Sequence, residues 1–519
     1  MKRIRIQVFV TVLSGLLASA GSPAADASEL PNIVLILCDD LGYGDVGCNN
    51  PQCKIPTPRV DRLAAEGMRL TDAHTTSSVC TPTRYGVLTG RYNWRSRLQT
   101  GVLGGLSERL IESDRLTVAE MLRQKGYDTA CIGKWHLGMD WARKPDTETF
   151  GDVIEKGSEG WNVDFTRPIT NGPNSVGFDY YFGIAASLDM VPYTYIENDR
   201  VTVLPTIDNA FPMMLGKDST TRRGPAAAEF DAMNVLPDLT GKAVEYIGKR
   251  ASSGRPFFLY LPLASPHTPI VPSPQWQGRS GLNPYADFVM ETDDCVGQVL
   301  DALEKCGVAG KTLVFFTSDN GCSPQADFPA LAEKGHNPSH IYRGHKADIW
   351  DGGHRVPLVV RWPGQVKAGS TSDQLVSLVD FLATCAEVTG TDLPDNAAED
   401  SVSLLPILLG KTKERVREAL VHHSISGKFS IRQGRWKLEL CPGSGGWSAP
   451  RDLQAVKQGL PGVQLYDMEA DPAEEKNLEA EHPEVVQRLT ALLERYVANG
   501  RSTPGEPQKN AVAVDIWKK

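Results

Sequence analysis

The sequence predicts an α/β protein in which a large, mostly parallel sheet is flanked by helices and followed by a smaller C-terminal α+β subdomain. Three observations support this fold class. Short apolar runs rich in β-branched residues alternate with helical stretches over most of the chain. Clusters of polar residues follow four of those runs directly. After Lys413 the alternation gives way to short strand-like pieces and one long helix.

Each element of the predicted sheet has its own signature. Residues 32–38 form a continuous apolar run that is too short for a typical helix, which predicts a buried strand. Thr57-Pro58 before 59–66, with Gly67 after it, is typical of a helix start and stop. The same patterns predict, in order, helix 117–125, strand 128–132, helix 242–251, strand 256–261, helix 285–306, strand 312–317 and strand 358–361.

Loops and a domain boundary interrupt this alternation. Segments 141–177 and 201–221 are rich in Gly, Pro, Asp and Thr and lack periodicity, so we expect long loops that shape a substrate cleft. A Pro- and Asp-rich stretch at 391–400 marks the boundary between a catalytic domain (28–395) and the C-terminal subdomain (396–519). The subdomain is predicted to hold a small antiparallel sheet and a helix, formed by strands 419–422, 429–432 and 436–440 and helix 483–498.

Composition and the N-terminus limit the classes of function. With 41% hydrophobic and 23% charged residues, the 519-residue chain has the composition of a folded globular protein. Its net charge of −9 lacks the basic excess that binds phosphate backbones, so no nucleic-acid partner is expected. Residues 1–25 have a basic start, an apolar run and small-residue cleavage sites, which predicts a signal peptide. We therefore expect an exported protein, periplasmic or secreted, with no stable membrane anchor.

Four polar clusters lie where the predicted strands end. In open α/β sheets, ligands collect outside the carboxyl ends of the strands, so these residues should meet at one edge. The clusters are Asp39-Asp40, Lys134-Trp135-His136, Ser265-Pro266-His267 and Asp319-Asn320-Gly321.

One subset of these residues offers only oxygen ligands: Asp39, Asp40, Asp319 and Asn320. Neighbouring carboxylates raise each other's pKa unless a cation is near, and a hard divalent ion removes that cost. An all-oxygen set suits calcium or magnesium and not zinc. The structural alternative is that Asp40 caps a helix and Asp319 begins an Asx-turn.

The stretch Cys80-Thr-Pro-Thr-Arg84 is typical of the modified nucleophile of a sulfate ester hydrolase. Taken alone, a buried core thiol would explain Cys80 equally well, because free Cys is among the most buried residue types. The ten cysteines do not form the disulfide framework of a small secreted domain. Cys48 and Cys53 flank a Pro-containing loop and could form a disulfide in an oxidising compartment.

With these motifs in place, the chain resembles the type I sulfatases, the formylglycine-dependent arylsulfatase group of the alkaline-phosphatase superfamily. The resemblance covers nearly the whole mature chain. The matching segments are Asp39-Asp40-Leu-Gly-Tyr-Gly-Asp45, Cys80-Thr-Pro-Thr-Arg84 with Leu88-Thr-Gly-Arg91, Gly133-Lys-Trp-His-Leu-Gly138, Pro266-His-Thr-Pro269, Ser318-Asp-Asn-Gly321, Gly344-His-Lys346 before Gly352-Gly-His-Arg355, and Leu465-Tyr-Asp-Met468 with Asp471-Pro472 and Asn477-Leu478.

The resemblance implies a sulfuric ester hydrolase that cleaves aryl or carbohydrate sulfate esters. A separate maturation enzyme, the formylglycine-generating enzyme, would oxidise Cys80 to formylglycine. One hydroxyl of the hydrated aldehyde would attack sulfur, and the other would lose its proton so that sulfate is expelled. The four oxygen ligands would hold Ca²⁺, with Mg²⁺ as the alternative.

The same resemblance implies a role for each cation and histidine of the motifs. Arg84 would hold the modified side chain, and Lys134 and Lys346 would clamp the sulfate oxygens. His136 would act as the base, and His267 would donate to the bridging oxygen. Either His267 or Lys346 would protonate the leaving group.

One motif departs from the family pattern. The usual Gly-Lys-Gly and Glu-Gly-Gly are replaced by Gly344-His345-Lys346 and Asp351-Gly-Gly, so His345 is an alternative sulfate contact. Further candidates for lining the mouth of the site are His74, His340, His345, Trp161 and Arg343.

Two other classes of function remain open at this point. A phosphoesterase or phosphonate hydrolase of the same superfamily can use this nucleophile, although the single-metal ligand set argues against it. A glycan-binding or sulfate-binding protein that keeps the fold without maturation of Cys80 is the non-enzymatic alternative, and the intact Arg84, Lys134, His136 and His267 argue against that.

Overall fold

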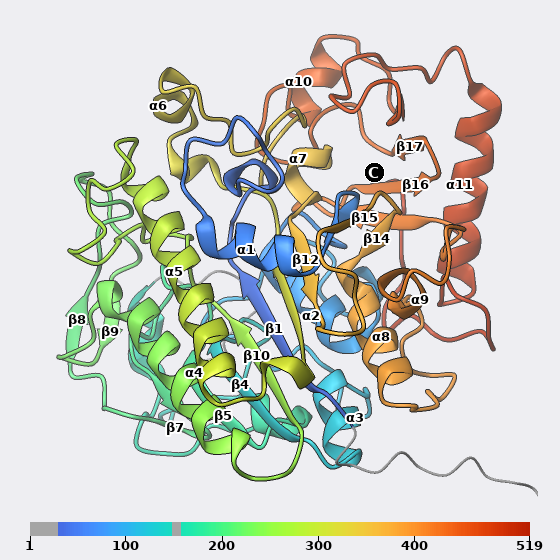
Figure 1. Ribbon diagram of the computed structural model, residues 1–519. Coiled ribbons are helices and arrows are strands. Elements are labelled where there is room, and N and C mark those ends of the chain that lie inside the picture. Colours follow the sequence, from blue (N-terminus) through green and yellow to red (C-terminus); the bar gives the residue numbers. More distant parts are fainter. Residues whose placement is uncertain (1–29, 148–156, 519) are drawn as a thin grey trace, which may run out of the picture.

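A ten-stranded mixed sheet runs through the molecule in the order β13-β2-β12-β11-β1-β10-β4-β5-β6-β7 (Figure 1). The computed structural model describes residues 30–147 and 157–518, and the predicted signal peptide at 1–25 lies outside the described residues. The five central strands are parallel to one another: β11 (Thr312–Ser318), β1 (Asn32–Cys38), β10 (Phe257–Pro262), β4 (Asp128–Lys134) and β5 (Tyr180–Ile184).

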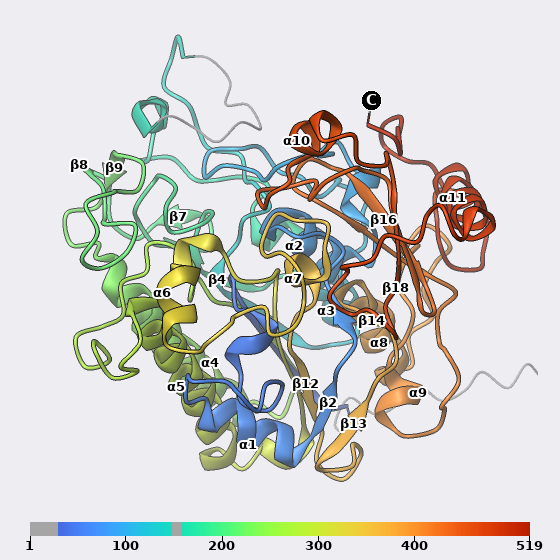
Figure 2. The same cartoon turned by 90° about the horizontal axis from the view of Figure 1, so that it is seen from above.

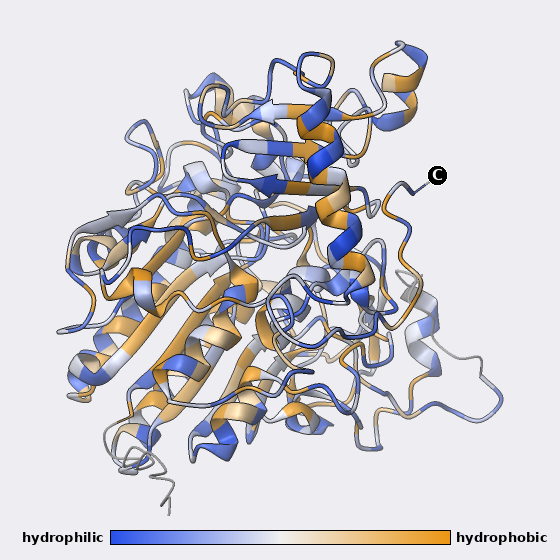
Figure 3. Cartoon of the chain, turned by 90° about the vertical axis from the view of Figure 1, so that its right-hand side faces the viewer, coloured by the Kyte–Doolittle hydropathy of each residue, from blue (hydrophilic) through white to orange (hydrophobic). Residues whose placement is uncertain are grey.

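Helices cover both faces of these central strands, as the sequence predicts (Figure 1). Val34 and Ile36 of β1 pack into the core formed with α1 (Pro58–Glu66), α4 (Val235–Ala251) and α5 (Pro284–Lys305). Ile33 and Leu35 point to the opposite core, which contains α2 (Cys80–Thr89), α3 (Val118–Gln124) and α8 (Phe381–Val388). Burial on both faces explains why the strands are continuously apolar, which Figure 3 shows along the sheet.

The sheet is mixed: antiparallel pairs flank its parallel centre, and β13 pairs parallel with β2 at one edge. Strand β12 (Leu358–Arg361) runs antiparallel to β11 and to β2 (Met68–Leu70), and β5 pairs antiparallel with β6 (Ile196–Glu197). An apolar run predicts a buried strand but says nothing of its direction, so the expectation of a mostly parallel sheet holds for the core and fails at the flanks.

One predicted helix starts earlier than expected. Helix α4 begins at Val235 and not at 242, with Pro237 in its first turn and Gly241 in its second. Proline is tolerated in a first helical turn because the N–H that it lacks has no partner there. Pro237 and Gly241 have low helix propensity, so the local pattern places the start of this helix later than the structure does.

The C-terminal part forms a second, smaller sheet beside the large one (Figure 2). Its four antiparallel strands are β15 (Leu420–His423), β16 (Phe429–Gln433), β17 (Trp436–Glu439) and β18 (Gln464–Asp467). Helix α11 (Pro483–Ala498) packs Leu489 and Leu493 against Phe429 and Leu438. The predicted strands and helix are present, and β18 is a fourth strand within the closing motif.

Shorter elements complete the described part: β3 (Ala73–His74), β7 (Arg200–Val201), β8 (Ile207–Asn209), β9 (Gly224–Ala226), α6 (Phe328–Glu333), α7 (Asp351–His354), β13 (Ser370–Ser372), β14 (Val376–Ser377), α9 (Leu405–Leu408) and α10 (Asp452–Lys457). Cys48 and Cys53 are free thiols, like the other eight cysteines. Across 30–147 and 157–518, no helix combines the length and apolar character that a bilayer crossing requires.

Candidate active site

The four polar clusters meet because their strands are neighbours in the sheet. The order β11-β1-β10-β4 places Asp319, Asp39, His267 and Lys134 in succession along one edge. The backbone N–H of Asp39 donates to the carbonyl of Ser265 at 2.9 Å, which ties the ends of β1 and β10 together. The expected convergence at the carboxyl ends of the strands is therefore found.

Cys80 lies at this edge, at the first residue of α2. Its Sγ, a carboxylate oxygen of Asp39 and one of Asp319 all lie within 4.8 Å of one another, and Cys80 is only 2% exposed. Residues 39, 80 and 319 thus form one cluster although they are far apart in sequence. Burial raises the pKa of the Cys80 thiol, so an unmodified Cys80 would be a poor thiolate nucleophile at neutral pH.

The four residues that offer oxygen atoms, Asp39, Asp40, Asp319 and Asn320, lie close together. Asn320 Nδ2 donates to Asp40 Oδ1 at 2.6 Å, and the Asp40 backbone N–H donates to Asp319 Oδ1 at 3.3 Å. Oδ1 of Asp39 and Oδ1 of Asn320 are buried and have no hydrogen-bond partner. Buried oxygens without partners are costly, and a hard cation would satisfy them. This set of residues fits a calcium-type ion.

Three cationic side chains balance the three carboxylates. Lys134 Nζ lies 2.6 Å from Asp39 Oδ2, and Lys346 Nζ lies 2.7 Å from Asp40 Oδ1. The Arg84 guanidinium donates to Asp319 Oδ2 through NH2 at 2.7 Å and through Nε at 2.9 Å. Addition of a divalent ion would leave the site positively charged, which favours an anionic ester.

The pKa values of Asp319 and Asp39 shift in opposite directions in this site. Burial and the neighbouring Asp39 charge raise the pKa of Asp319 to about 6. Burial would also raise the pKa of Asp39, but the positive charges of His267, Lys134 and Arg84 hold it well below its usual range. The raised pKa of Asp319 follows from burial and a like charge, and the lowered pKa of Asp39 follows from the cations around it.

The two predicted histidines are oriented by backbone carbonyls. His136 Nε2 lies 2.7 Å from the Leu103 carbonyl, and its Nδ1 is buried without a partner. Burial and the charges of Lys134 and Arg84 keep the pKa of His136 well below its usual value, so its imidazole is neutral. His267 Nδ1 lies 2.6 Å from the Thr268 carbonyl, and its Nε2 lies 3.6 Å from Asp40 Oδ2.

Solvent reaches the site on one side. His267 and Lys346 are 7% and 6% exposed, whereas the other predicted site residues are between 0% and 2% exposed. A substrate would therefore approach past His267 and Lys346.

At the segment that departs from the family pattern, Lys346 and not His345 reaches the carboxylates. The His345 Nε2 instead lies 3.0 Å from Ser448 Oγ, and Asp348 accepts the backbone N–H groups of Trp447 and Ser448 at 2.8 and 3.0 Å. Ser448 and Asp348 were not predicted. No local signal points to them, because the contact joins the C-terminal loop to a segment 100 residues earlier.

The other candidates for the mouth of the site differ in their surroundings. His74 is fully buried in a separate cluster with His354 and His422, so it cannot line an opening. Arg343 covers the Trp350 ring at 3.6 Å, and Trp161 Nε1 donates to Asp208 at 3.1 Å.

The class defined by this fold and site is a hydrolase with the alkaline-phosphatase-like architecture. A sulfatase family model matches residues 31–391, and a model described as N-sulphoglucosamine sulphohydrolase, C-terminal, matches residues 345–440. The chain belongs to the sulfatase family and is a sulfuric ester hydrolase.

Relatives extend over nearly the whole chain. An N-acetylgalactosamine-6-O-sulfatase of Bacteroides thetaiotaomicron is 33% identical over 93% of this chain and 96% of its own length. Arylsulfatase A of Homo sapiens is 33% identical over 89% of this chain and 87% of its own. A solved structure from work on the metabolism of multiple glycosaminoglycans by Bacteroides thetaiotaomicron has a TM-score of 0.77 and 33% identity, and it covers 90% of this chain and 99% of its own.

Proposed function

We propose that this sulfatase cleaves carbohydrate sulfate esters with a modified Cys80 as nucleophile and a bound calcium ion. The observation that carries the proposal is the cluster in which Cys80 Sγ lies within 4.8 Å of carboxylate oxygens of Asp39 and Asp319. A thiol whose pKa is raised by burial needs conversion to a better nucleophile, and the family resemblance supplies one in formylglycine. The hydrated aldehyde would offer one hydroxyl to attack sulfur and a second whose deprotonation releases sulfate.

The surrounding residues then have distinct tasks. Arg84, fixed by Asp319 and by the Lys134 carbonyl at 2.9 Å, would hold the modified side chain in place. Lys134 and Lys346 would turn from the carboxylates to the sulfate oxygens, where preorganised cations stabilise the charge of the transition state. Neutral His136 would accept the proton from the second hydroxyl, because a neutral imidazole is a base.

His267 is placed to assist departure of the alcohol. Its position on the exposed side of the site, near Asp40, suits a donor to the bridging oxygen. Lys346, on the same side, is the alternative proton donor. We assign the donor role to His267, because Lys346 would be engaged with the sulfate oxygens.

Calcium would be held by Asp39, Asp40, Asp319 and Asn320. When bound, the ion supplies Lewis-acid polarisation of the sulfate and a fixed template for it. The two buried oxygens without partners, Oδ1 of Asp39 and of Asn320, support this assignment.

A carbohydrate substrate is supported by the relative named N-acetylgalactosamine-6-O-sulfatase, which matches over 96% of its own length. A rate comparison on sulfated monosaccharides, an aryl sulfate and the matching phosphate esters tests this. Higher kcat/KM on a carbohydrate sulfate is expected, and a preference for phosphate esters would contradict the assignment.

Conversion of Cys80 is tested by mass spectrometry of the purified native protein. The Cys80 peptide is expected to have the mass of an aldehyde in place of a thiol. Cys80→Ala should abolish ester cleavage, by at least about 10³-fold, with an unchanged unfolding midpoint. Cys131→Ala, which removes another buried thiol, is the matched control and should remain active. Full activity of Cys80→Ala would end the nucleophile assignment.

Metal dependence is tested by chelation and by Asp319→Asn. We expect one calcium per chain in the native protein, loss of turnover on its removal, and recovery when calcium is restored. Asp319→Asn removes one charge from the ligand set without changing its shape, so calcium affinity should fall at least tenfold. A fully active protein shown to contain no divalent ion would refute the calcium site.

Export and maturation complete the proposal. The predicted signal peptide at 1–25 would direct the chain out of the cytoplasm, and a formylglycine-generating enzyme would act on the Cys80 segment before folding buries it. N-terminal sequencing of the native protein should find a start close to residue 26.

A further inference from the structure

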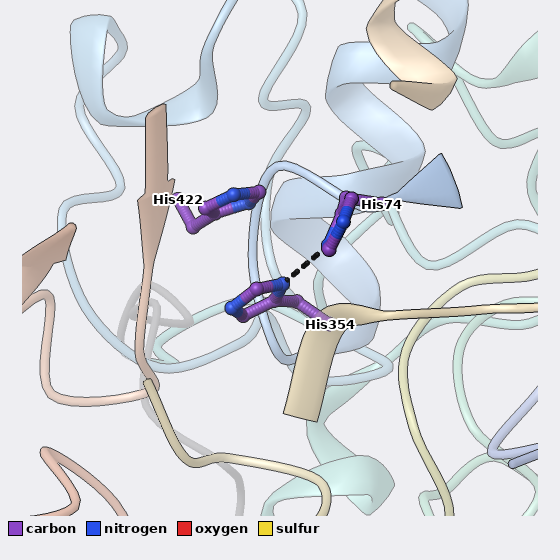
Figure 4. Close-up of side chains that lie close together, drawn as sticks. All are labelled: His74, His354 and His422. Carbon is purple, nitrogen blue, oxygen red and sulfur yellow. Dashed lines mark hydrogen bonds between the residues drawn. The ribbon is translucent and has the colours of Figure 1, made fainter. Parts of the chain in front are cut away.

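Three histidines from distant parts of the chain form a second buried cluster, where β3, α7 and β15 meet (Figure 4). His74 ends β3, His354 ends α7 and His422 lies in β15. All three side chains are inaccessible to solvent. None of them belongs to the site around Cys80.

The inner ring nitrogens of the cluster face one another. His74 Nδ1 and His354 Nδ1 are 3.0 Å apart, and one nitrogen from each of the three rings lies within 4.8 Å of the others. His422 Nε2 is buried and has no hydrogen-bond partner. An orphaned buried nitrogen beside two close imidazole nitrogens is a set of lone pairs that a metal ion would satisfy.

The outer ring nitrogens are each fixed by an acceptor. His74 Nε2 lies 2.8 Å from Asp72 Oδ1, His354 Nε2 lies 3.0 Å from the Ile349 carbonyl, and His422 Nδ1 lies 2.9 Å from the Thr75 carbonyl. Histidine ligands of metals generally donate their outer N–H to a carboxylate or carbonyl in this way. With all outer nitrogens protonated, the inner nitrogens of His74 and His354 would repel each other unless a cation lay between them.

We propose that His74, His354 and His422 bind one divalent transition-metal ion of the zinc class, which clamps the C-terminal sheet to β3 and α7. Neutral imidazole nitrogens suit zinc, cobalt, nickel or copper and not calcium. Burial lowers the pKa of His74 to about 4 and holds the pKa values of His354 and His422 well below their usual range, so the ligands are in the form that binds metal.

The ring positions are close to those of a tetrahedral site. The His74 ring centre is 5.1 Å from each of the other two ring centres, and zinc–nitrogen bonds of about 2.0–2.1 Å at tetrahedral angles give roughly 5 Å. The ring centres of His354 and His422 are 3.9 Å apart, so one ring must move outward by roughly 1 Å when the ion binds. The unpartnered Nε2 of His422 means that its tilt breaks no hydrogen bond at the ligating atom.

The charges around the cluster leave room for a cation. The ion-paired groups beside it comprise four carboxylates and three cationic side chains: Asp72, Asp351, Glu439, Glu474, Arg355, Arg432 and Lys437. A cavity of about 450 Å³ is lined in part by Asp72, Arg355 and Arg432, and Asp72 also contacts His74 Nε2.

Without a metal, a chain of hydrogen bonds can also give a partner to the ring nitrogens of His74 and His354. Lys437 Nζ lies 3.1 Å from His354 Nε2, so the ammonium could donate there and His354 Nδ1–H could donate to His74 Nδ1. That chain gives His422 Nε2 no partner. The two arrangements differ in one measurable property, which is affinity for a transition metal.

The test uses the full-length protein without a polyhistidine tag, in millimolar calcium so that the oxygen site is saturated. Metal content is measured after purification, and Co²⁺ is then titrated into the metal-depleted protein while visible absorption is recorded. We expect one equivalent of metal per chain and the absorption bands of nitrogen-coordinated tetrahedral Co²⁺.

Two variants remove a ligand while keeping the outer hydrogen bond. His422→Asn keeps a donor for the Thr75 carbonyl, and His74→Gln keeps one for Asp72. Each should weaken Co²⁺ binding by roughly 100-fold or more. His423→Asn, at the next position of β15, is the matched control and should bind Co²⁺ like the wild type, because the His423 ring lies outside the cluster, with Nδ1 3.1 Å from the Ser424 carbonyl.

Circular dichroism of each ligand variant shows whether it is folded. If one variant does not fold, the Co²⁺ affinity of the other tests the proposal. A wild-type protein that takes up no Co²⁺ or Zn²⁺ at micromolar concentration would overturn the proposal and leave the Lys437 chain. Equal Co²⁺ affinity in the wild type and both ligand variants would overturn it as well.

Discussion

Two residues of the active site occupy backbone conformations that few side chains adopt. Asp40 and His136 have φ values of 65° and 56°, in the left-handed region that is usually left to glycine. Such a conformation costs on the order of 1–3 kcal/mol and persists only where the surrounding structure holds it. The conformation of Asp40 directs its carboxylate toward Asn320 and Lys346. The conformation of His136 places its ring against the Leu103 carbonyl.

A single buried carboxyl outside the site should make stability depend on pH. Asp293 accepts the backbone N–H groups of Arg59 and Val60 at the start of α1, and burial, with a contribution from Asp61, raises its pKa to about 7. In the unfolded chain its pKa is about 3.9, so the folded state holds the proton more tightly. The stability that Asp293 contributes is therefore complete below about pH 4 and is lost as the pH rises through 7.

Comparison of the wild type with Asp293→Asn, which does not titrate, checks this. The wild type should lose roughly 2–3 kcal/mol of unfolding free energy relative to the variant between pH 5 and pH 8. Urea unfolding at both pH values measures the difference. A constant difference would show that Asp293 is ionised throughout.

At the scale of elements, glycines allow neighbouring strands to approach closely enough to aim Lys134. Gly133 precedes Lys134 in β4 and has φ 140°, and a Cβ added to it would lie 1.9 Å from the Pro262 carbonyl oxygen of β10. On the other side, a Cβ added to Gly183 of β5 would lie 1.8 Å from the Gly133 carbonyl oxygen. The strand therefore cannot keep its place with any side chain at 133.

Gly133→Ala should cost roughly 2–4 kcal/mol of stability and move Lys134 away from Asp39. Because small displacements of a positioning group reduce turnover strongly, kcat should fall by about 10²-fold in the folded fraction. Gly241→Ala in α4 is the control: no atom lies within 4 Å of its added Cβ, so it should stabilise the helix by about 0.5–1 kcal/mol. Equal behaviour of the two variants would contradict the packing argument.

At the scale of the whole molecule, a buried lysine links the two sheets. Lys437 of β17 contacts Asp351 of α7 at 3.0 Å, Glu474 at 2.6 Å and Glu439 at 3.2 Å, and its side chain is fully buried. Burial and the neighbouring carboxylates Glu439 and Asp351 raise the pKa of Glu474 well above its usual value even with Lys437 present. The lysine is therefore essential to this junction.

Lys437→Met should lower the free energy of unfolding by about 3–5 kcal/mol, because it leaves buried carboxylates without a counter-charge. The exposed Lys457→Met in α10 is the control and should change it by less than about 0.5 kcal/mol. Urea unfolding followed by tryptophan fluorescence measures both. A Lys437→Met protein as stable as the wild type would mean that the junction does not depend on the ion pairs.

The local patterns of the sequence were sufficient for the central strands, most helices and the family of the chain. Apolar runs, caps and short motifs report on residues within a few positions of one another, so they predicted β1, α5 and the Cys80 segment well. They could not predict that β12 runs antiparallel, since side-chain pattern does not encode strand direction.

The sequence by itself determined the family of the chain, because the short ordered motifs that carry the resemblance are each local in sequence. It predicted the nucleophile and the oxygen ligands from the residue types in Asp39-Asp40, Cys80–Arg84 and Asp319-Asn320. Only the tertiary structure decided that Lys346 and not His345 reaches Asp40, that Ser448 holds His345, and that His74, His354 and His422 meet. Contacts between segments hundreds of residues apart depend on sheet order and on the packing of two sheets, and no local pattern records either.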